Sequence, residues 1–401
     1  MTEKLFYNDP SLLEFEATIR QHKATGELHE VVLDRTCFFP GGGGQPADRG
    51  TLGAARVVDV EERGDAIVHF VDAAPGAEGT RVHGAVDAAR RRDFMVQHTG
   101  QHILSQALFT VGKLPTVSVH FGDDTVTIEL EASSVAEGLL REAEKLANTI
   151  IRENREVKIH EVDPRDAGRF PLRRTPPEVG RLRVVEVGSF DWAACSGLHV
   201  TATGQIGLIK IVAQEKIRGR TRIHALIGDR AMDDYGRKVT IIQSLMRLLT
   251  CGEADIPARV EELARNAREN EKELERLQVE CAASDAEAAV GVAKSLGKTL
   301  LVRRILQSAG PAYLKAFAEQ VLINPGRVVI VIDRGPEAFQ WIAAHSLGNR
   351  IELPALVRPI LGLLNAKGGG RGAWMQGAGA PADGAEAFAE AVEGVLTRAL
   401  T

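Results

Sequence analysis

The chain has 401 residues, of which 44% are hydrophobic and 26% are charged, and its formal net charge at pH 7 is −5. This length allows two or three domains with cores of their own, and the composition is that of an ordinary soluble protein. No apolar run approaches the roughly 20 residues of a membrane span. The negative net charge excludes a uniformly basic surface, although a local basic stripe is enough to bind nucleic acid.

Residues 1–90 are predicted to form a small β-barrel subdomain. Short alternating segments are separated by clusters of glycine, proline and aspartate, which is typical of antiparallel strands joined by turns. The predicted strands are Phe15–Arg20, His29–Asp34, Arg56–Glu61 and Ala66–Asp72. The start of the chain lacks the apolar core of a signal peptide, and four scattered cysteines suggest no disulfide framework, so we expect a cytoplasmic location.

A glycine-rich segment, CFFPGGGGQPADRG, runs from Cys37 to Gly50 within this subdomain. Four consecutive glycines do not suit the interior of a helix or strand, because they lack side chains to pack. A simple hinge or turn is one interpretation. The flanking aromatic and proline residues favour an anchored loop instead. The segment has no Lys-Ser/Thr after its glycines, which argues against a nucleoside-triphosphate phosphate loop.

Residues 91–230 are predicted to form an α+β domain, with helices packed on a largely antiparallel sheet. The predicted helices are Phe94–Val111 and Ser134–Arg155. The predicted strands are a stretch at Thr116–Glu129, then Val157–Glu161, Arg183–Val187, Gly207–Ala213 and Arg222–Ile227.

Two pairs spaced four residues apart stand out in this domain: His98 and His102 in HTGQHILSQAL, and Cys195 and His199 in CSGLHV. On a helix, residues four apart lie on the same face. One such histidine pair is more often a coincidence, with one ring packed in the core and the other solvated. Three imidazoles and one thiolate from two segments, however, make a full ligand set for zinc, and we therefore predict a zinc site at these residues.

Basic residues occur on both sides of the second pair. They are Arg169, Arg173, Arg174, Arg181 and Arg183 before it, and Lys210, Lys216, Arg218, Arg220 and Arg222 after it. Taken alone, such stripes are best explained as solvated, salt-bridged faces. Because these stripes flank Cys195 and His199, we also consider them as a nucleic-acid contact.

Residues 231–285 are predicted to form a helical arm. Apolar residues and one asparagine follow each other at steps of three and four, which is the pattern of a coiled-coil seam. This seam consists of Val260, Leu263, Ala267, Asn270, Leu274, Leu277 and Cys281. Asn270 in its middle could fix the register of a coiled coil. It could equally face solvent at the edge of a helical hairpin with Tyr235–Thr250.

Residues 286–401 alternate strand and helix patterns, which predicts a small α/β domain. The predicted elements are strand Thr299–Ile305, helix Pro311–Leu322, strands Val328–Asp333 and Phe339–Ala344, and helices Ala355–Asn365 and Ala385–Leu400. The segment GGGRGAWMQGAG, Gly368–Gly379, is interpreted as a loop before the last helix. Such a loop could bind an anion, or it could be a tight structural turn.

With these motifs in place, the chain resembles the free-standing alanyl-tRNA editing proteins of the long AlaX type, which are similar to the editing half of alanyl-tRNA synthetase. HTGQHILSQAL resembles the first zinc motif of that family, CSGLHV the second, and FFPGGGGQPADRG its glycine-rich signature. The C-terminal glycine segment resembles the DHH-associated domain that follows the editing domain. One departure is visible, because the synthetases usually have Gly and Thr where Ser196 and Leu198 stand.

The resemblance implies an aminoacyl-tRNA deacylase that hydrolyses the ester of serine, and potentially glycine, mischarged to tRNA(Ala), with one Zn²⁺ per chain. It implies a pocket with Thr36 and Gln45 as polar groups for the serine hydroxyl, although the first could be an ordinary strand residue and the second a loop-capping amide. Substrate or tRNA contacts are expected at Gly42, Gly43, Gly44, Arg218, Arg222, Gly369, Gly370 and Arg371.

Two alternative functions stay open from the sequence. The chain could be a non-catalytic tRNA- or protein-binding module whose zinc is only structural, or a metallohydrolase of small esters or of D-aminoacyl-tRNA. A homodimer could form through the helical arm or the C-terminal domain.

Overall fold

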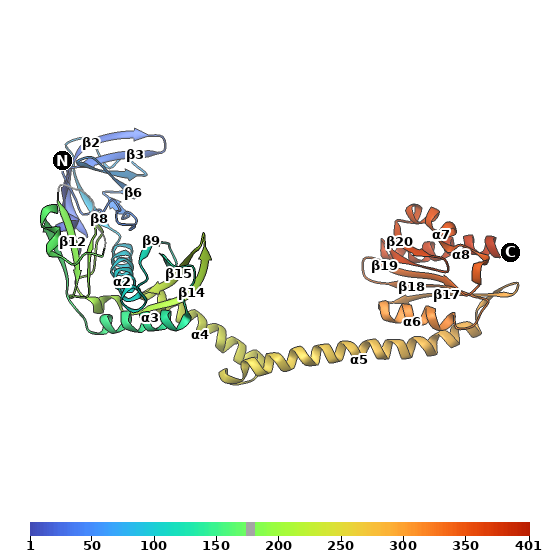
Figure 1. Ribbon diagram of the computed structural model, residues 1–401. Helices are drawn as coiled ribbons and strands as arrows, with labels where there is room; N and C mark the ends of the chain where they lie inside the picture. Colours follow the sequence, from blue (N-terminus) through green and yellow to red (C-terminus); the bar gives the residue numbers. More distant parts are fainter. Residues whose placement is uncertain (174–180) are drawn as a thin grey trace. The chain divides into compact units, whose positions relative to one another are not determined.

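The computed structural model describes residues 1–173 and 181–401, and the chain forms two compact units, Met1–Ser244 and Leu245–Thr401 (Figure 1). Both units mix helices with sheets, so the predicted α+β class is confirmed. The finer division at residues 90, 230 and 285 stays a prediction. Across the described ranges, none of the helices has both the length and the apolar character needed to cross a bilayer.

Six antiparallel strands close into a barrel at the N-terminus, in the order β2-β3-β7-β6-β5-β8. The strands are β2 (Glu14–Thr25), β3 (Leu28–Leu33), β5 (Gly50–Leu52), β6 (Ala55–Arg63), β7 (Ala66–Val71) and β8 (Arg81–Val86). Alternate residues point inward because successive side chains of a strand face opposite sides. The pattern in β2 is clear, since Phe15, Ala17 and Ile19 are buried. The glycine-rich segment connects β4 (Arg35–Thr36) to β5.

The rest of the first unit surrounds one long helix, α2 (Ala88–Gly112). Asp87 caps this helix by accepting a hydrogen bond from the Arg90 backbone N–H. A four-stranded antiparallel sheet has the order β14-β15-β10-β9, and a three-stranded sheet has the order β11-β12-β13. The strands are β9 (Thr116–Phe121), β10 (Val126–Leu130), β11 (Val157–Val162), β12 (Leu182–Val187), β13 (Asp191–Ala194), β14 (Ile209–Ile217) and β15 (Arg220–Ile227). Helix α3 (Glu137–Arg152) packs against α2.

The second unit is built on a six-stranded sheet in the order β16-β17-β18-β19-β21-β20. The strands are β16 (Lys294–Leu296), β17 (Thr299–Gln307), β18 (Arg327–Arg334), β19 (Phe339–His345), β20 (Ala366–Arg371) and β21 (Trp374–Gly379). Helix α6 (Pro311–Val321) packs on one face, while α7 (Leu353–Leu361) and α8 (Ala385–Leu400) belong to the core of the other. Strand β18 is buried from both sides, with Ile330 in one core and Val331 in the other.

The interpretation of Gly368–Gly379 as a loop before a helix is wrong, because most of this segment lies in the antiparallel hairpin of β20 and β21. At two glycines of this hairpin, the neighbouring atoms lie too close for any side chain to fit. A Cβ on Gly377 would lie 2.0 Å from the Lys367 carbonyl oxygen, and a Cβ on Gly368 would lie 2.3 Å from the Trp341 ring. Here glycine permits close packing of strands. Because glycine has a low strand propensity, the sequence alone favours a loop at this place.

Two helices occupy the predicted arm: α4 (Asp229–Leu249), which contains the boundary between the units, and α5 (Ile256–Gly291). The end of α5 packs on α6 through Ala282 and Ala286. Earlier along α5, four apolar residues of the predicted seam are exposed. They are Val260, Leu263, Leu274 and Leu277.

Candidate metal centre and its cavity

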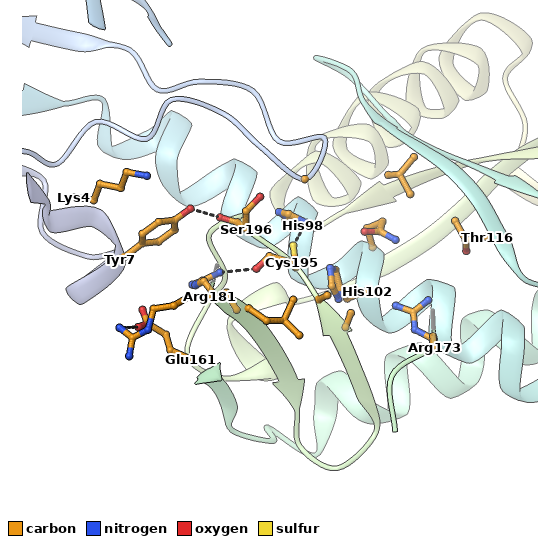
Figure 2. Close-up of a pocket in the computed structure, with 17 residues that line it drawn as sticks. Lys4, Tyr7, His98, His102, Thr116, Glu161, Arg173, Arg181, Cys195 and Ser196 are labelled. Carbon is orange, nitrogen blue, oxygen red and sulfur yellow. Dashed lines mark hydrogen bonds and ion pairs between the residues drawn. The ribbon is translucent and has the colours of Figure 1, made fainter. Parts of the chain in front are cut away.

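The two predicted ligand pairs come together in the first unit. His98 and His102 lie on α2, and Cys195 lies in the segment that follows β13 (Figure 2). His199 lies four residues further along the same segment. One ligand atom from each residue lies within 4.8 Å of the ligand atoms of the others. The Sγ of Cys195 is 3.2 Å from Nε2 of His98. Four donor atoms this close form a cluster that could hold one metal ion.

Each of the three imidazoles donates its Nδ1–H to a group behind it. His98 donates to Oε1 of Gln45 over 3.0 Å, and His102 donates to Oδ2 of Asp191 over 3.1 Å. His199 donates to Oγ1 of Thr99 over 3.1 Å. These bonds select the tautomer that turns every Nε2 toward the cluster, as in proteins whose histidines bind metals.

The acceptors are themselves held in place, which supports this direction for each bond. The Gln45 Oε1 atom also accepts the backbone N–H of Leu198, so it must be the oxygen of the amide. The Thr99 hydroxyl donates to the Met95 carbonyl oxygen and therefore accepts from the imidazole. By contrast, Nε2 of His199 is buried without any hydrogen-bond partner. A buried nitrogen without a hydrogen-bond partner among the protein groups is what a metal-binding histidine would show.

The electrostatics of the cluster favour the ligand form of the cysteine. Burial alone would raise the pKa of the Cys195 thiol. The electrostatic effect of His98 and the contacts of the sulfur with the other imidazoles of the cluster instead hold that pKa well below its usual value. Since the thiolate is the form that binds metals, the site is prepared for a cation.

A buried carboxylate supports the second histidine. Burial would lower the pKa of His102, but the hydrogen bond to Asp191, together with Cys195, raises it to about 9. Asp191 is itself paired with Arg173, whose Nη2 lies 2.9 Å from Oδ2. Asp191 could not be predicted from the sequence, because an aspartate four residues before a cysteine is not part of a recognised ligand motif.

The glycine-rich segment packs directly against the cluster. Gly43 has a φ of 61°, and a Cβ on it would lie 3.2 Å from both Sγ of Cys195 and Cε1 of His98. A Cβ on Gly197 would lie only 2.1 Å from Cε1 of His98. Two glycines, one from each side, therefore leave room for the His98 ring.

A buried ion pair anchors the end of this segment. Asp48 pairs with Arg91 of α2, and both side chains are almost fully buried. Asp48 also accepts the backbone N–H of Phe39, and Arg91 donates to the backbone carbonyl of Cys37. Breaking such a pair by removing one partner costs about 3–5 kcal/mol, because an unpaired charge stays buried. The segment is an anchored loop, as predicted.

The metal cluster opens into a cavity of about 820 Å³. The cavity is lined by Lys4, Tyr7, Gly43, His98, Gln101, His102, Thr116, Val119, Glu161, Arg173, Arg181, Leu182, Arg183, Ala193, Ala194, Cys195 and Ser196. Neither Thr36 nor Gln45 is among these residues. The Thr36 hydroxyl is buried in the barrel, where it donates to Nε2 of His69 over 2.8 Å.

Three polar residues at or behind the cavity lining were not predicted as site residues, although two of them, Gln101 and Ser105, lie within HTGQHILSQAL. Ser105 is fully buried, and its Oγ accepts two hydrogen bonds, each of 2.8 Å, from Nε2 of Gln101 and from the hydroxyl of Thr116. Gln101 and Thr116 line the cavity, and Gln101 is the neighbour of His102 on α2. With its proton committed to Ser105, the Thr116 oxygen retains lone pairs that can accept a hydrogen bond.

The other predicted contact residues lie in different places. A Cβ on Gly42 would touch Ser196, and one on Gly44 would touch Phe121. Arg222 pairs with Glu129 and Glu215, and Arg218 lies in the turn between β14 and β15. Gly369, Gly370 and Arg371 belong to β20 of the second unit. Arg174 lies outside the described residues.

Two family models match the chain. Residues 182–224 match the threonyl and alanyl tRNA synthetase second additional domain, and residues 3–90 match the tRNA synthetases class II (A). The first match contains Cys195 and His199, and the second contains the glycine-rich segment.

Curated relatives align with nearly the whole chain. The alanine–tRNA ligase of Halorubrum lacusprofundi is 30% identical over 98% of this chain and 44% of its own length. The corresponding ligase of Pyrococcus abyssi is 31% identical over 92% of this chain and 41% of its own. The chain thus spans less than half the length of these relatives. The predicted resemblance to alanyl-tRNA synthetase is confirmed.

One solved structure, the C-Ala domain of Aquifex aeolicus alanyl-tRNA synthetase, is 22% identical and covers 27% of this chain and 96% of its own. Its TM-score of 0.24 is too low to establish a shared fold.

Proposed function

We propose that this chain, which is similar to alanyl-tRNA ligases along nearly its whole length, hydrolyses the ester that joins serine to tRNA(Ala). The observation that carries the proposal is the set of three Nδ1–H donations, which turn three imidazoles and a thiolate toward one point at a cavity. The match to alanyl-tRNA ligases supplies the class of substrate.

Zn²⁺ suits this donor set best, because imidazole and thiolate ligands in a four-ligand cluster are typical of zinc. His98, His102, Cys195 and His199 would hold it, one ion per chain. A zinc ion at this place would supply Lewis acidity toward an ester oxygen. The residues around it would keep the rings fixed, so that no reorganisation is needed when substrate binds.

We assign recognition of the serine hydroxyl to Gln101 and Thr116. The Thr116 oxygen can accept a hydrogen bond from the hydroxyl, and the amide of Gln101 can both donate and accept. A correctly charged alanine offers only a methyl group and would leave these groups unpaired. Sites built to bond a hydroxyl reject the analogue that lacks it by far more than the 1–3 kcal/mol available from a methylene.

This assignment replaces the expected contacts of Thr36 and Gln45 with the hydroxyl. Thr36 supports His69 in the barrel, and Gln45 is a positioning residue that holds His98 from behind. The glycine-rich segment then matters for the shape of the metal site. Substrate contacts of the glycines, of Arg218 and Arg222, and of Gly369 to Arg371 stay proposals.

A second candidate is a tRNA-binding module whose zinc is only structural. The observation that favours it is the presence of four protein ligands, because structural zinc sites are closed in this way whereas catalytic sites usually keep a position open. In that case the metal would stabilise the fold and the cavity would bind tRNA without hydrolysis.

The test is a deacylation assay with tRNA(Ala) charged with serine, glycine, alanine or D-alanine, each with and without a chelator. We expect rapid release of serine, slow release of alanine, and loss of activity in His102→Ala. Thr116→Val should lower the preference for serine over alanine at least about tenfold, which corresponds to about 1.4 kcal/mol. His83→Ala, a change at an exposed histidine of the barrel, serves as control.

If His102→Ala deacylates as fast as the unmodified protein, the metal centre has no essential role in hydrolysis. If no charged tRNA is hydrolysed but the chelator abolishes tRNA binding, the structural-zinc candidate is correct instead. Preferred hydrolysis of D-alanine would assign the cavity to D-aminoacyl-tRNA.

A further inference from the structure

The cavity has two chemically different sides, with the metal cluster between them (Figure 2). Thr116 and Arg173 lie on one side, and Gln101 is linked to Thr116 through Ser105. The charge of Arg173 is neutralised there by its ion pair with Asp191, and we call this the neutral side. Lys4 and Tyr7 lie on the other. We call Lys4, Tyr7, Arg181 and Arg183 the cationic wall of the cavity.

We propose that the cationic wall is a subsite for one phosphodiester group of the RNA strand, one nucleoside away from the ester. The inference rests on the proposed function, because it assumes an ester at the metal cluster. With the acyl group on the neutral side, the nucleoside and its phosphate extend to the opposite side. The wall therefore sets the direction in which the substrate enters.

Arg183 gives the wall a fixed positive charge. Its Nη1 donates to the backbone carbonyls of Cys195 and Gly197, and its guanidinium lies over the Tyr7 ring, 5.0 Å from the centroid. Its Nη2 is buried without a hydrogen-bond partner, and it forms no ion pair with any carboxylate of the described residues. The Cys195 sulfur and Glu161 act on this charge through space but form no ion pair with it. In a region of reduced dielectric, such a charge attracts anions more strongly than in water.

Tyr7 contacts both the Arg183 guanidinium and the backbone next to the metal cluster. Its hydroxyl donates to the Ser196 carbonyl over 3.1 Å, so Tyr7 and Arg183 together hold the backbone on both sides of Ser196, next to the ligand Cys195. The wall and the cluster therefore keep a constant spacing. A constant spacing is what a subsite must have to bind a phosphate at a set distance from an ester.

Lys4 and Arg181 supply the mobile contacts. Lys4 pairs with Glu62 over 2.6 Å, and Arg181 pairs with Glu161 over 3.4 Å, with all four side chains at least 30% exposed. Exposed ion pairs contribute only about 0–1 kcal/mol. Both cations can therefore exchange a carboxylate for a phosphate at little cost, and charge-assisted hydrogen bonds to phosphate are stronger than neutral ones.

The experiment measures binding by fluorescence anisotropy and does not depend on hydrolysis. The full chain is titrated into an uncharged tRNA(Ala) acceptor minihelix, either unmodified or with the last phosphodiester replaced by a neutral methylphosphonate. We expect the neutral linkage to weaken binding to the wild-type chain about tenfold. The double variant Lys4→Gln/Arg181→Gln should bind the unmodified RNA about tenfold more weakly. Its further loss with methylphosphonate should be clearly smaller than that of the wild type, because only the fixed charge of Arg183 remains to contact the phosphate.

The matched control is Lys158→Gln/Arg165→Gln, which removes two exposed cations outside the cavity. It should retain the full loss with methylphosphonate. The double variant of the wall should also reduce the slope of log K against log salt by about 0.7, the value for one phosphate of a single strand. Equal losses in the wall variant and the wild type, or no loss in the wild type, would overturn the subsite.

A failure of the proposed function gives a different result. If the chain does not hydrolyse seryl-tRNA(Ala) but its binding is still more sensitive to methylphosphonate when the cationic wall is intact, the subsite stands and the hydrolysis does not.

Discussion

Each histidine of the cluster has one ring nitrogen committed to the protein and one left for a ligand. Gln45, Asp191 and Thr99 make these commitments with three different chemical groups: an amide, a carboxylate and a hydroxyl. The carboxylate is the one that carries charge, and it is fully buried. Asp191 should therefore contribute more to metal affinity than the neutral acceptors.

Replacing Asp191 with asparagine keeps the shape and an oxygen acceptor but removes the charge. We expect zinc affinity, measured by competition with a chromophoric chelator, to fall about 10- to 100-fold, as for other carboxylates that accept a hydrogen bond from a metal-binding histidine. Asp163→Asn, at an exposed aspartate paired with Arg165, should leave the affinity unchanged. An unchanged affinity in Asp191→Asn would show that the carboxylate does not support the metal.

His69 makes the stability of the barrel depend on pH. Burial lowers its pKa from 6.5 to about 4, against the opposing effect of its hydrogen bond to the Val31 carbonyl. The folded state therefore prefers the neutral ring. The resulting stability is complete above pH 6.5 and is lost as the pH falls toward 4, by about 3 kcal/mol for this shift.

His69→Gln removes the titrating group but keeps a donor and an acceptor. Urea unfolding at pH 7 and pH 4 should show a loss of unfolding free energy that is about 3 kcal/mol smaller in the variant than in the wild type. A change at the exposed His83, His83→Gln, should leave the wild-type pH dependence intact. Identical pH profiles for wild type and His69→Gln would contradict the buried neutral histidine.

At the scale of elements, the two segments that meet at His98 depend on glycine for their approach. Gly197→Ala would place a methyl group 2.1 Å from Cε1 of the ring, so the ring must move away from the cluster. We expect zinc binding and seryl-tRNA hydrolysis to fall at least tenfold while the circular dichroism spectrum stays the same. Gly168→Ala, where a Cβ meets nothing within 4 Å, is the control. Wild-type zinc affinity in Gly197→Ala would contradict the packing.

Helix α5 exposes the predicted seam along one stripe, and such a stripe is more stable when a partner covers it. We predict a homodimer, with light scattering after gel filtration giving twice the 43.3 kDa chain mass. Leu263→Glu/Leu274→Glu should give monomers, and Arg268→Glu, off the seam, should not. A monomeric wild type at micromolar concentration would refute the predicted association.

At the scale of the whole molecule, the sequence was informative wherever a spacing repeats a structural period. His98 and His102 follow the helical spacing of four on α2, and the barrel strands alternate with a period of two. Cys195 and His199 have the same spacing of four but lie in a non-helical segment, so the prediction of these two ligands rested on their residue types and not on a structural period. The supports of the ligands could not be predicted in this way. Asp191, Thr99 and Ser105 are ordinary residue types whose importance comes only from which segments the fold brings together.

The glycines of Gly368–Gly379 also could not be interpreted correctly without their tertiary neighbours. A run of glycines in a sequence suggests a conformationally free backbone. At Gly368 and Gly377, however, glycine is required because Trp341 and a neighbouring strand leave no space for a Cβ. From the sequence, Thr36 and Gln45 are expected to line the pocket. In the structure, Thr36 lies within the barrel and Gln45 lies on the side of His98 that faces away from the metal cluster. Only the tertiary neighbours distinguish a residue that lines a cavity from one that supports its wall.

X-ray absorption at the zinc edge can show whether His98, His102, Cys195 and His199 hold one zinc ion. We expect one zinc per chain, with three nitrogen neighbours at about 2.0–2.1 Å and one sulfur at about 2.3 Å. The sulfur shell should vanish in Cys195→Ser. Purified protein without zinc, or a shell of nitrogen and oxygen alone in the wild type, would contradict the account.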